Sequence, residues 1–332
     1  FINNFENNEF NNNDNKRWMN GGGTGLIIEL SYLKDKNGID KEVSLNFVDC
    51  FFISNNAEIY GGGFCFIESK ETTTFIKLDN CYFKGNTCNK NEGSALYLDV
   101  KNVTFNNCIF ESNSKMKLIE DENKHSAVYL HFVTENDDSE SFTIENCSFI
   151  DNHDYSLHIH NCSKKLTVLN CIFTEKAFHA SNCNDLIKVK NCSFSNCIEK
   201  SIHIDSCQND VTIFDCSIVS AKEDNFIFIE KSSSFIMENV FIKGNETIKD
   251  FAISFYSTKS LIIENVTIMN SGGIYALKDA SKSDHITLKN VNIKESNYGF
   301  YCFDDYNDDD DDLLQSNVFI NINECTFSSV KH

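Results

Sequence analysis

The stretch Leu166-Thr167-Val168-Leu169-Asn170-Cys171-Ile172-Phe173 decides the fold of this 332-residue chain. Its first four residues have the period-two, β-branched pattern of a short strand, and no helical period of 3.6 follows. The stretch ends with the four-residue motif Asn-Cys-x-Phe, which is called the word below. It returns as Asn191-Cys192-Ser193-Phe194, where the cysteine lies 192 − 171 = 21 residues further on. The stretch is therefore one unit of a repeat.

Looser forms of this word, with Asn, Asp or Glu first and Cys or Val second, run along the chain. The mean step between second positions is (325 − 50)/10 = 27.5 residues, which leaves room for two or three short strands per repeat. Such repeats stack parallel strands, so we predict an all-β, right-handed parallel β-helix, a solenoid of about eleven or twelve coils. A propeller blade needs about 40 residues, and a left-handed β-helix needs a hexapeptide period. The second positions are residues 50, 81, 108, 147, 171, 192, 216, 240, 266, 291 and 325.

The same pattern sets the expected domain organisation. Residues 1–20 are an irregular, Asn-rich start or a partial first coil, and residues 21–332 form a single β-helix domain. Loop insertions are expected near 134–141 and 304–315. Within each coil, the Phe or Ile of the word points inward, and its Asn or Asp forms a ladder at a bend.

Eleven of the fifteen cysteines fall in two predicted ladders. Valine replaces cysteine at three main-word positions, which is typical of a small buried hydrophobic residue. We therefore predict mainly packed thiols. A few disulfides are the second alternative, and a metal site is the least favoured because Cys-x-x-Cys is absent from the sequence.

Several short sequence motifs of the chain resemble those of a known protein family. Ser271-Gly272-Gly273-Ile274 is similar to the Gly-Gly-Ala-Ile word of polymorphic outer membrane protein (Pmp) repeats, and Phe83-Lys84-Gly85-Asn86 is similar to that family's Phe-x-x-Asn word. Similar repeats occur in predicted surface proteins of protists. The resemblance implies an extracellular or cell-surface, adhesin-like β-helix and supplies no catalytic residues.

Charge narrows the possible partners. The net charge is −20, with 49 acidic and 29 basic residues, and Arg17 is the only arginine. Nucleic acids and anionic membrane surfaces are disfavoured as partners, and the sequence has no apolar run of a membrane-span length. We expect no cofactor. A carbohydrate or protein ligand on a surface is the expected partner.

Three functions remain open at this point. A non-enzymatic adhesion or recognition module is favoured over a filament or matrix subunit that self-associates through its coil ends. A polysaccharide lyase or hydrolase comes last, because Arg17 lies outside the repeats and the paired aspartates fall in loops. An acidic surface would also repel an anionic polymer.

The candidate binding face follows from strand alternation. If Leu96 and Leu98 point inward, Tyr97 between them points outward, and the same holds in later coils. The stacked histidines could bind a transition metal or act as a pH-sensitive patch. An exposed aromatic ladder without a ligand is the favoured interpretation, a stripe that docks a sugar or a partner protein comes second, and a metal site comes last. The candidate binding residues are Tyr97, Tyr129, His158, His160, His179, His203, Asp205, Tyr275 and Tyr301.

Two further sites are predicted in loops. Clustered carboxylates offer a weak calcium site at Asp304, Asp305, Asp308, Asp309 and Asp310, but the run lacks the ligand spacing of a calcium loop, so a solvated loop is favoured. Among six Asn-x-Ser/Thr sequons, Asn245 is the one expected in an open loop and is the candidate for glycosylation.

Overall fold

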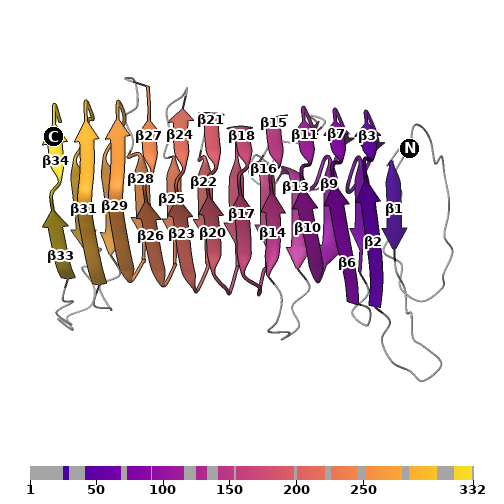
Figure 1. The fold of residues 1–332 in the computed structure, drawn as a ribbon, viewed down its shortest axis with the longest axis horizontal. Coiled ribbons are helices and arrows are strands. Elements are labelled where there is room, and N and C mark those ends of the chain that lie inside the picture. Colours follow the sequence, from indigo (N-terminus) through magenta and orange to yellow (C-terminus); the bar gives the residue numbers. More distant parts are fainter. Residues whose placement is uncertain are drawn as a thin grey trace. The chain divides into compact units, whose positions relative to one another are not determined.

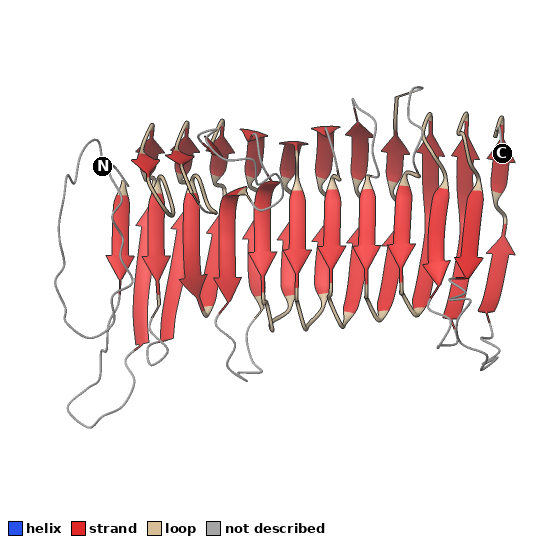
Figure 2. Ribbon diagram, turned by 180° about the vertical axis from the view of Figure 1, so that it is seen from behind, coloured by secondary structure: helices blue, strands red, loops and turns tan. Residues whose placement is uncertain are grey.

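The structure is a computed structural model that divides into two compact units, residues 1–161 (unit 1) and 162–332 (unit 2). All regular structure in its described part is β-strand, without helix (Figures 1 and 2). Accordingly, no described helix has the length and apolar character of a membrane span. The described residues are 25–29, 42–68, 73–90, 92–115, 125–132, 141–152, 155–197, 200–220, 226–245, 251–278, 284–304 and 318–330.

Unit 1 repeats a series of short strands, and each strand pairs in parallel with its counterpart one coil later (Figure 1). The face that matters below, face A, contains β1 (Leu26–Glu29), β5 (Phe64–Ile67), β9 (Leu96–Val100), β13 (Ser126–Phe132) and β16 (Tyr155–His160). The other strands are β2 (Glu42–Val48), β3 (Phe51–Ile53), β4 (Asn56–Ala57), β6 (Thr73–Asp79), β7 (Tyr82–Lys84), β8 (Thr87–Cys88), β10 (Asn102–Asn106), β11 (Ile109–Glu111), β12 (Ser114–Lys115), β14 (Phe142–Glu145) and β15 (Ser148–Asn152).

Unit 2 continues the same design with parallel pairing throughout the pairs described. Its face A contains β19 (Phe178–Ser181), β22 (Ile202–Asp205), β25 (Ile227–Glu230), β28 (Ile253–Tyr256), β30 (Ile274–Lys278) and β32 (Phe300–Asp304). The other strands are β17 (Leu166–Leu169), β18 (Ile172–Glu175), β20 (Ile187–Lys190), β21 (Ser193–Cys197), β23 (Asp210–Phe214), β24 (Ser217–Ser220), β26 (Ser234–Glu238), β27 (Phe241–Lys243), β29 (Ser260–Met269), β31 (Asp284–Lys294), β33 (Val318–Asn323) and β34 (Thr326–Ser328).

Each unit is therefore a parallel β-helix, which confirms the predicted architecture. Among the described residues, face A has five strands in unit 1 and six in unit 2, in line with the predicted number of coils. The prediction of a single domain from residue 21 to 332 stays a prediction.

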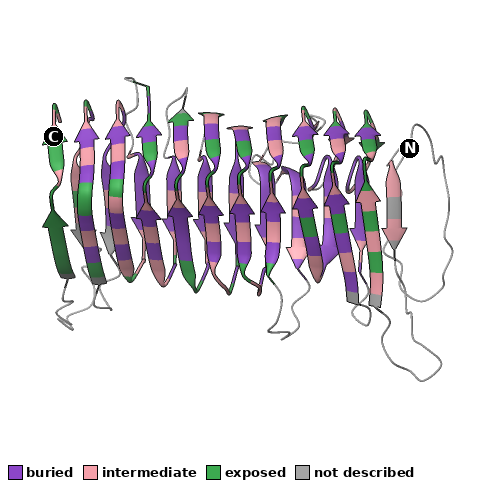
Figure 3. Cartoon of the chain, viewed as in Figure 1, coloured by how far each residue is buried: buried purple, intermediate pink, exposed green. Residues whose placement is uncertain are grey.

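The phenylalanine of the repeated word forms the core ladder. In unit 1, Phe83 and Phe110 stack with their ring centroids 4.9 Å apart, and in unit 2 Phe173 and Phe194 stack at 5.0 Å. All four side chains are fully buried, as predicted. Figure 3 shows the resulting alternation of buried and exposed residues along the strands. The spacing of the rings matches the strand spacing of about 4.8 Å, so each coil stacks on the one before it.

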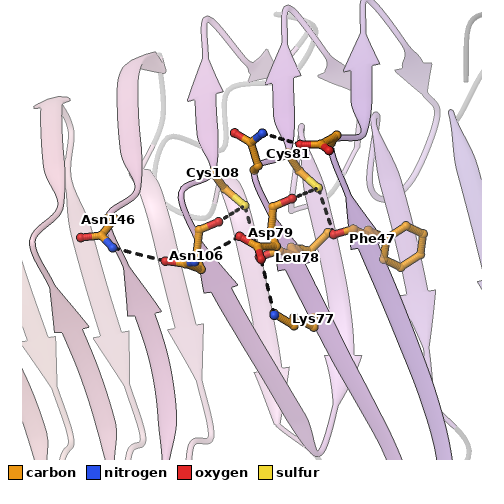
Figure 4. Close-up of polar contacts among 10 residues, drawn as sticks. Phe47, Lys77, Leu78, Asp79, Cys81, Asn106, Cys108 and Asn146 are labelled. Carbon is orange, nitrogen blue, oxygen red and sulfur yellow. Dashed lines mark hydrogen bonds and ion pairs between the residues drawn. The ribbon is translucent and has the colours of Figure 1, made fainter.

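The Asn or Asp of the word makes the predicted bend. Asn170 and Asn191 adopt left-handed backbone conformations with φ of 54° and 53°, which asparagine tolerates better than most residues. The amide Nδ2 of Asn191 donates to Oδ1 of Asn170 at 2.7 Å, so the ladder is hydrogen bonded from coil to coil. In unit 1, Asn106 donates to Asp79 at 3.1 Å beside the bend (Figure 4).

All fifteen cysteines are free thiols in this structure, in keeping with the packing prediction. Figure 4 shows the thiol of Cys108 turned toward the carbonyl oxygens of Leu78 and Asn106, at 3.5 and 3.3 Å. Burial raises the pKa of the Cys162 thiol to about 12 and that of Cys197 to about 11. Such thiols stay protonated and inert near neutral pH.

A second ladder of buried amides explains the Phe-x-x-Asn word. Asn86, Asn113 and Asn152 of unit 1 are fully buried. Oδ1 of Asn113 accepts hydrogen bonds from both N and Nδ2 of Asn86, each at 3.0 Å. Nδ2 of Asn113 donates to the carbonyl oxygen of Phe83 at 3.0 Å and to Oδ1 of Asn152 at 3.1 Å. The amide of Asn113 thus satisfies buried polar groups of two other coils.

Candidate recognition face

The outer side of face A carries the predicted binding residues. In unit 1 the strand register aligns Tyr97 with Tyr129, and Tyr129 with His158. The flanking residues Leu96 and Leu98 are fully buried, so strand alternation turns the rings outward, as expected. The predicted alignment of these three side chains is confirmed.

The rings of unit 1 pack closely against one another. Tyr97 and Tyr129 stack at 5.3 Å with an angle of 20° between their planes, and Tyr60 covers Tyr97 at 4.3 Å. The ring of His158 meets Tyr129 edge-on at 5.0 Å, and His158 is only 9% exposed. Burial raises the pKa of both Tyr97 and Tyr129 well above the ordinary tyrosine value. This part of the ladder points outward but is largely covered.

Beside the unit 1 rings lies a row of histidines and carboxylates. Nδ1 of His131 is 3.1 Å from Oδ1 of Asp99, and its ring stacks on His160 at 5.6 Å. Nδ1 of His158 lies 3.5 Å from Oε1 of Glu92. Both imidazoles therefore lie within ion-pair distance of a carboxylate, and the predicted pH-sensitive patch stays a prediction.

In unit 2 the histidine part of the ladder begins at β19. The rings of His179 and His203 are parallel within 4° and their centroids are 4.3 Å apart, which confirms their predicted alignment. Phe228 follows His203 edge-on at 5.2 Å, and Nζ of Lys200 lies 3.7 Å from the Phe228 centroid. Asp205 lies two residues beyond His203 on the same strand and is half-buried. The predicted stacking of His158 on His179 would join the two units and stays a prediction.

The later coils of unit 2 form a broader aromatic group, the C-terminal aromatic patch. It consists of Phe251, Tyr256, Tyr275, Tyr298 and Tyr301. Tyr275 and Tyr301 are parallel within 9° at 5.9 Å, and Phe251 stacks on Tyr298 at 4.7 Å. Tyr301 is 48% exposed, which makes it the most open of the aromatic site residues predicted from the sequence.

Besides the charged and histidine side chains described above (Glu92, Asp99, His131 and Lys200), five Tyr and Phe residues of this face were not among the predicted ones. Tyr60, Phe251 and Tyr298 lie in the turns just before the strands, outside the repeated words. Phe228 was missed because only tyrosine and histidine were followed along the ladder, and its register with His203 would have found it. Tyr256 lies two residues beyond the ladder position, which Ser254 occupies in that coil, and its ring reaches Phe228 at 5.0 Å. The signal available was the high aromatic content of residues 251–256 and 298–303.

The remaining predicted sites lie elsewhere. Asn245 is exposed at the end of the segment after β27, as expected of an open acceptor. Asp304 ends β32, and the other predicted calcium ligands lie outside the described residues: Asp305, Asp308, Asp309 and Asp310. Within the described residues, no group of three His, Cys, Asp or Glu side chains is arranged to hold a metal ion. The predicted insertions near 134–141 and 304–315 also lie almost wholly outside the described residues.

Comparisons with known proteins address the fold. The family model for the right-handed β-helix region matches residues 176–332. The fold is a right-handed parallel β-helix. No curated protein matches the chain by sequence. One solved structure similar to this chain is that of PfbA, a surface adhesin of Streptococcus pneumoniae, with a TM-score of 0.41 and 11% sequence identity over 92% of this chain and 76% of that one.

Proposed function

We propose that this chain is a recognition module of adhesin type, displayed at a cell surface or outside the cell, which binds its ligand on the outer side of face A. The observation that carries the proposal is the aromatic ladder. Three successive coils of unit 1 place a Tyr or His ring at the ladder position of face A, and five of the six described face A strands of unit 2 place a His, Phe or Tyr ring there, with Ser254 in the remaining strand. Unit 1 contributes Tyr97 and Tyr129, and unit 2 contributes Tyr275 and Tyr301 among others.

The chemistry of these side chains suits a docking surface. Aromatic rings bury a large area at low cost in conformational entropy, and tyrosine adds a hydroxyl that forms hydrogen bonds at a wet interface. A rigid β-helix holds such side chains in a fixed order, so that little ordering is required on binding. The acidic chain, with its net charge of −20, favours neutral or basic ligands over polyanions.

The proposed role is binding rather than catalysis. The resemblance of the short motifs to Pmp-type repeats and to surface proteins of protists supports this role. That the chain is of this type is itself part of the proposal. A filament or matrix subunit stays the second prediction, and a polysaccharide-cleaving enzyme stays the third.

The proposal is tested by measuring the binding of the purified chain to immobilised cells and to glycan and matrix-protein arrays. A triple variant, Tyr129→Ala, His158→Ala and His179→Ala, is compared with the wild type at equal fold content, monitored by circular dichroism. A matched control replaces Lys188 and Lys190 by alanine on the outer side of β20. The proposal predicts loss of binding only in the triple variant. Equal binding by all three proteins, together with unchanged binding by the variant Tyr298→Ala/Tyr301→Ala at the later coils of face A, would refute it.

A further inference from the structure

We infer that the C-terminal aromatic patch is a binding site for neutral saccharides, with Phe251, Tyr298 and Tyr301 at its centre. This inference rests on the proposed recognition role of face A and names the ligand class for one part of it. It differs from the sequence-based prediction because it selects the open end of the ladder over the histidine rows.

The patch is built around a glycine. Phe251 precedes β28 and Tyr298 precedes β32, and β30 lies between these two strands. At the matching point of the intervening coil stands Gly272, which has no side chain. The rings of Phe251 and Tyr298 close over this gap, with centroids 4.7 Å apart and planes within 30°. Two turns and the tyrosine ladder of β30 and β32 thereby join into one surface.

The neighbouring glycine holds this arrangement in place. A Cβ atom at Gly273 would lie 1.8 Å from the carbonyl oxygen of Gly299 and 2.4 Å from that of Tyr298. Only glycine therefore allows the next coil to approach this closely. The same approach brings the backbone of Tyr298 against β30, so the Gly-Gly word determines where the ring of Tyr298 lies.

The spacing of the rings and their exposure separate this patch from the histidine pair of unit 2. The rings of His179 and His203 are parallel and 4.3 Å apart, so the sides that face each other are hidden. In the patch, the parallel rings of Tyr275 and Tyr301 are 5.9 Å apart, and Phe251 is tilted by 37° from Tyr275 and by 34° from Tyr301. Phe251, Tyr275 and Tyr298 are half-buried, so part of each side chain is open to solvent. The 48% exposure of Tyr301 agrees with this geometry.

The composition of the patch points to a neutral sugar. The patch contains no acidic or basic residue, and four of its five side chains are tyrosines that bring phenol hydroxyls. A pyranose ring offers an apolar C–H face for aromatic contact and hydroxyls at its edge for hydrogen bonds, which matches rings with polar tips. Anionic sugars are disfavoured by the net charge of −20. In unit 1 the equivalent face carries charged groups instead, such as the contact of Asp99 with His131.

The test measures binding of the whole chain to cellohexaose, mannohexaose and chitohexaose by calorimetry, with polygalacturonate as the anionic comparison. The double variant Tyr298→Ala/Tyr301→Ala is the central perturbation. The matched control is Phe241→Ala, which removes an aromatic ring that is 38% exposed on β27. Thermal unfolding of each variant shows whether it is folded. Tyr301→Phe keeps the ring and removes only the hydroxyl, so this variant replaces the double variant in the binding assay if the double variant unfolds.

We expect at least one neutral oligosaccharide to bind, with affinity reduced roughly tenfold in the double variant and unchanged in Phe241→Ala. Binding of polygalacturonate alone, or neutral-sugar binding that the double variant retains, would overturn the inference. If no sugar binds but the double variant loses binding to cells or matrix proteins, the saccharide inference fails and the proposed function stands. If the double variant loses nothing in either assay and the triple variant also binds normally, both fail.

Discussion

Replacing Asn113 by alanine tests the stacking of the coils, because this side chain lies fully buried between coils of unit 1. The change removes two hydrogen bonds accepted from Asn86 and two donated, to the carbonyl oxygen of Phe83 and to Asn152. The backbone N–H of Asn86 then loses its side-chain acceptor, and the carbonyl of Phe83 loses a donor. A buried polar group left without its partner costs about 1–3 kcal/mol. We therefore expect Asn113→Ala to lower the free energy of unfolding by about 3 kcal/mol.

The assay is urea denaturation of the intact chain, followed by circular dichroism. The matched control is Asn106→Ala, since Asn106 makes amide hydrogen bonds to Asp79 and Asn146 on the outer surface, where water replaces them. Its expected cost is below about 1 kcal/mol. If Asn113→Ala cost no more than Asn106→Ala, the buried amide ladder would not stabilise the coils as argued.

The other predictions concern the phenylalanine core, the buried carboxyl group of Glu68, the thiols and Gly273. Phe173→Ala should lower the free energy of unfolding, measured by urea denaturation, by about 3–5 kcal/mol, whereas Ile172→Ala, at a 48% exposed position, should lower it far less. Equal losses would contradict the assignment of Phe173 to the buried side of its strand and Ile172 to the exposed side. Burial raises the pKa of Glu68 to about 7, so the folded state favours the protonated carboxyl group. The protonated group makes its full contribution to the free energy of unfolding below the ordinary glutamic acid pKa, and this contribution of about 2 kcal/mol is lost as the pH rises through 7. The difference in unfolding free energy between wild type and Glu68→Gln should therefore change between pH 5 and pH 8, and a constant difference would contradict the shift. Thiol titration of the denatured protein should find mainly free cysteines, and six or more disulfides would overturn the packing argument. Gly273→Ala should lower the thermal unfolding midpoint, because its Cβ would meet a backbone oxygen at 1.8 Å; an unchanged midpoint would show that the coils relax apart.

The fold was predictable because one word carries three separate physical requirements. An inward ring such as Phe173, a bend residue such as Asn170 with φ of 54°, and a small buried residue such as Cys171 each recur in nearly every coil. A requirement that recurs is visible in the sequence even when no single occurrence is convincing. The outward direction of Tyr97 and Tyr129 followed from the same alternation.

The site was only partly predictable, because its decisive features do not repeat. Phe251 and Tyr298 lie in turns, and their contact depends on the absence of a side chain at Gly272 in the coil between them. The alternation gives the direction in which a ring points and not how far its neighbours cover it. Tyr129 and Tyr301 share one ladder pattern, yet burial raises the pKa of Tyr129, whereas Tyr301 is 48% exposed.

The most direct test of the proposed recognition face is tyrosine footprinting of the whole chain, in which nitration is mapped by mass spectrometry in the free and surface-bound states. In the free protein, Tyr301 should react fast, while Tyr97 and Tyr129, which pack against neighbouring rings, should react slowly. On binding to the target surface, Tyr301 should become protected, while Tyr82, which lies on the outer side of β7 away from face A, should keep its reactivity. Protection of Tyr82 with Tyr301 left reactive would contradict the account, since the ligand would then dock outside the proposed face.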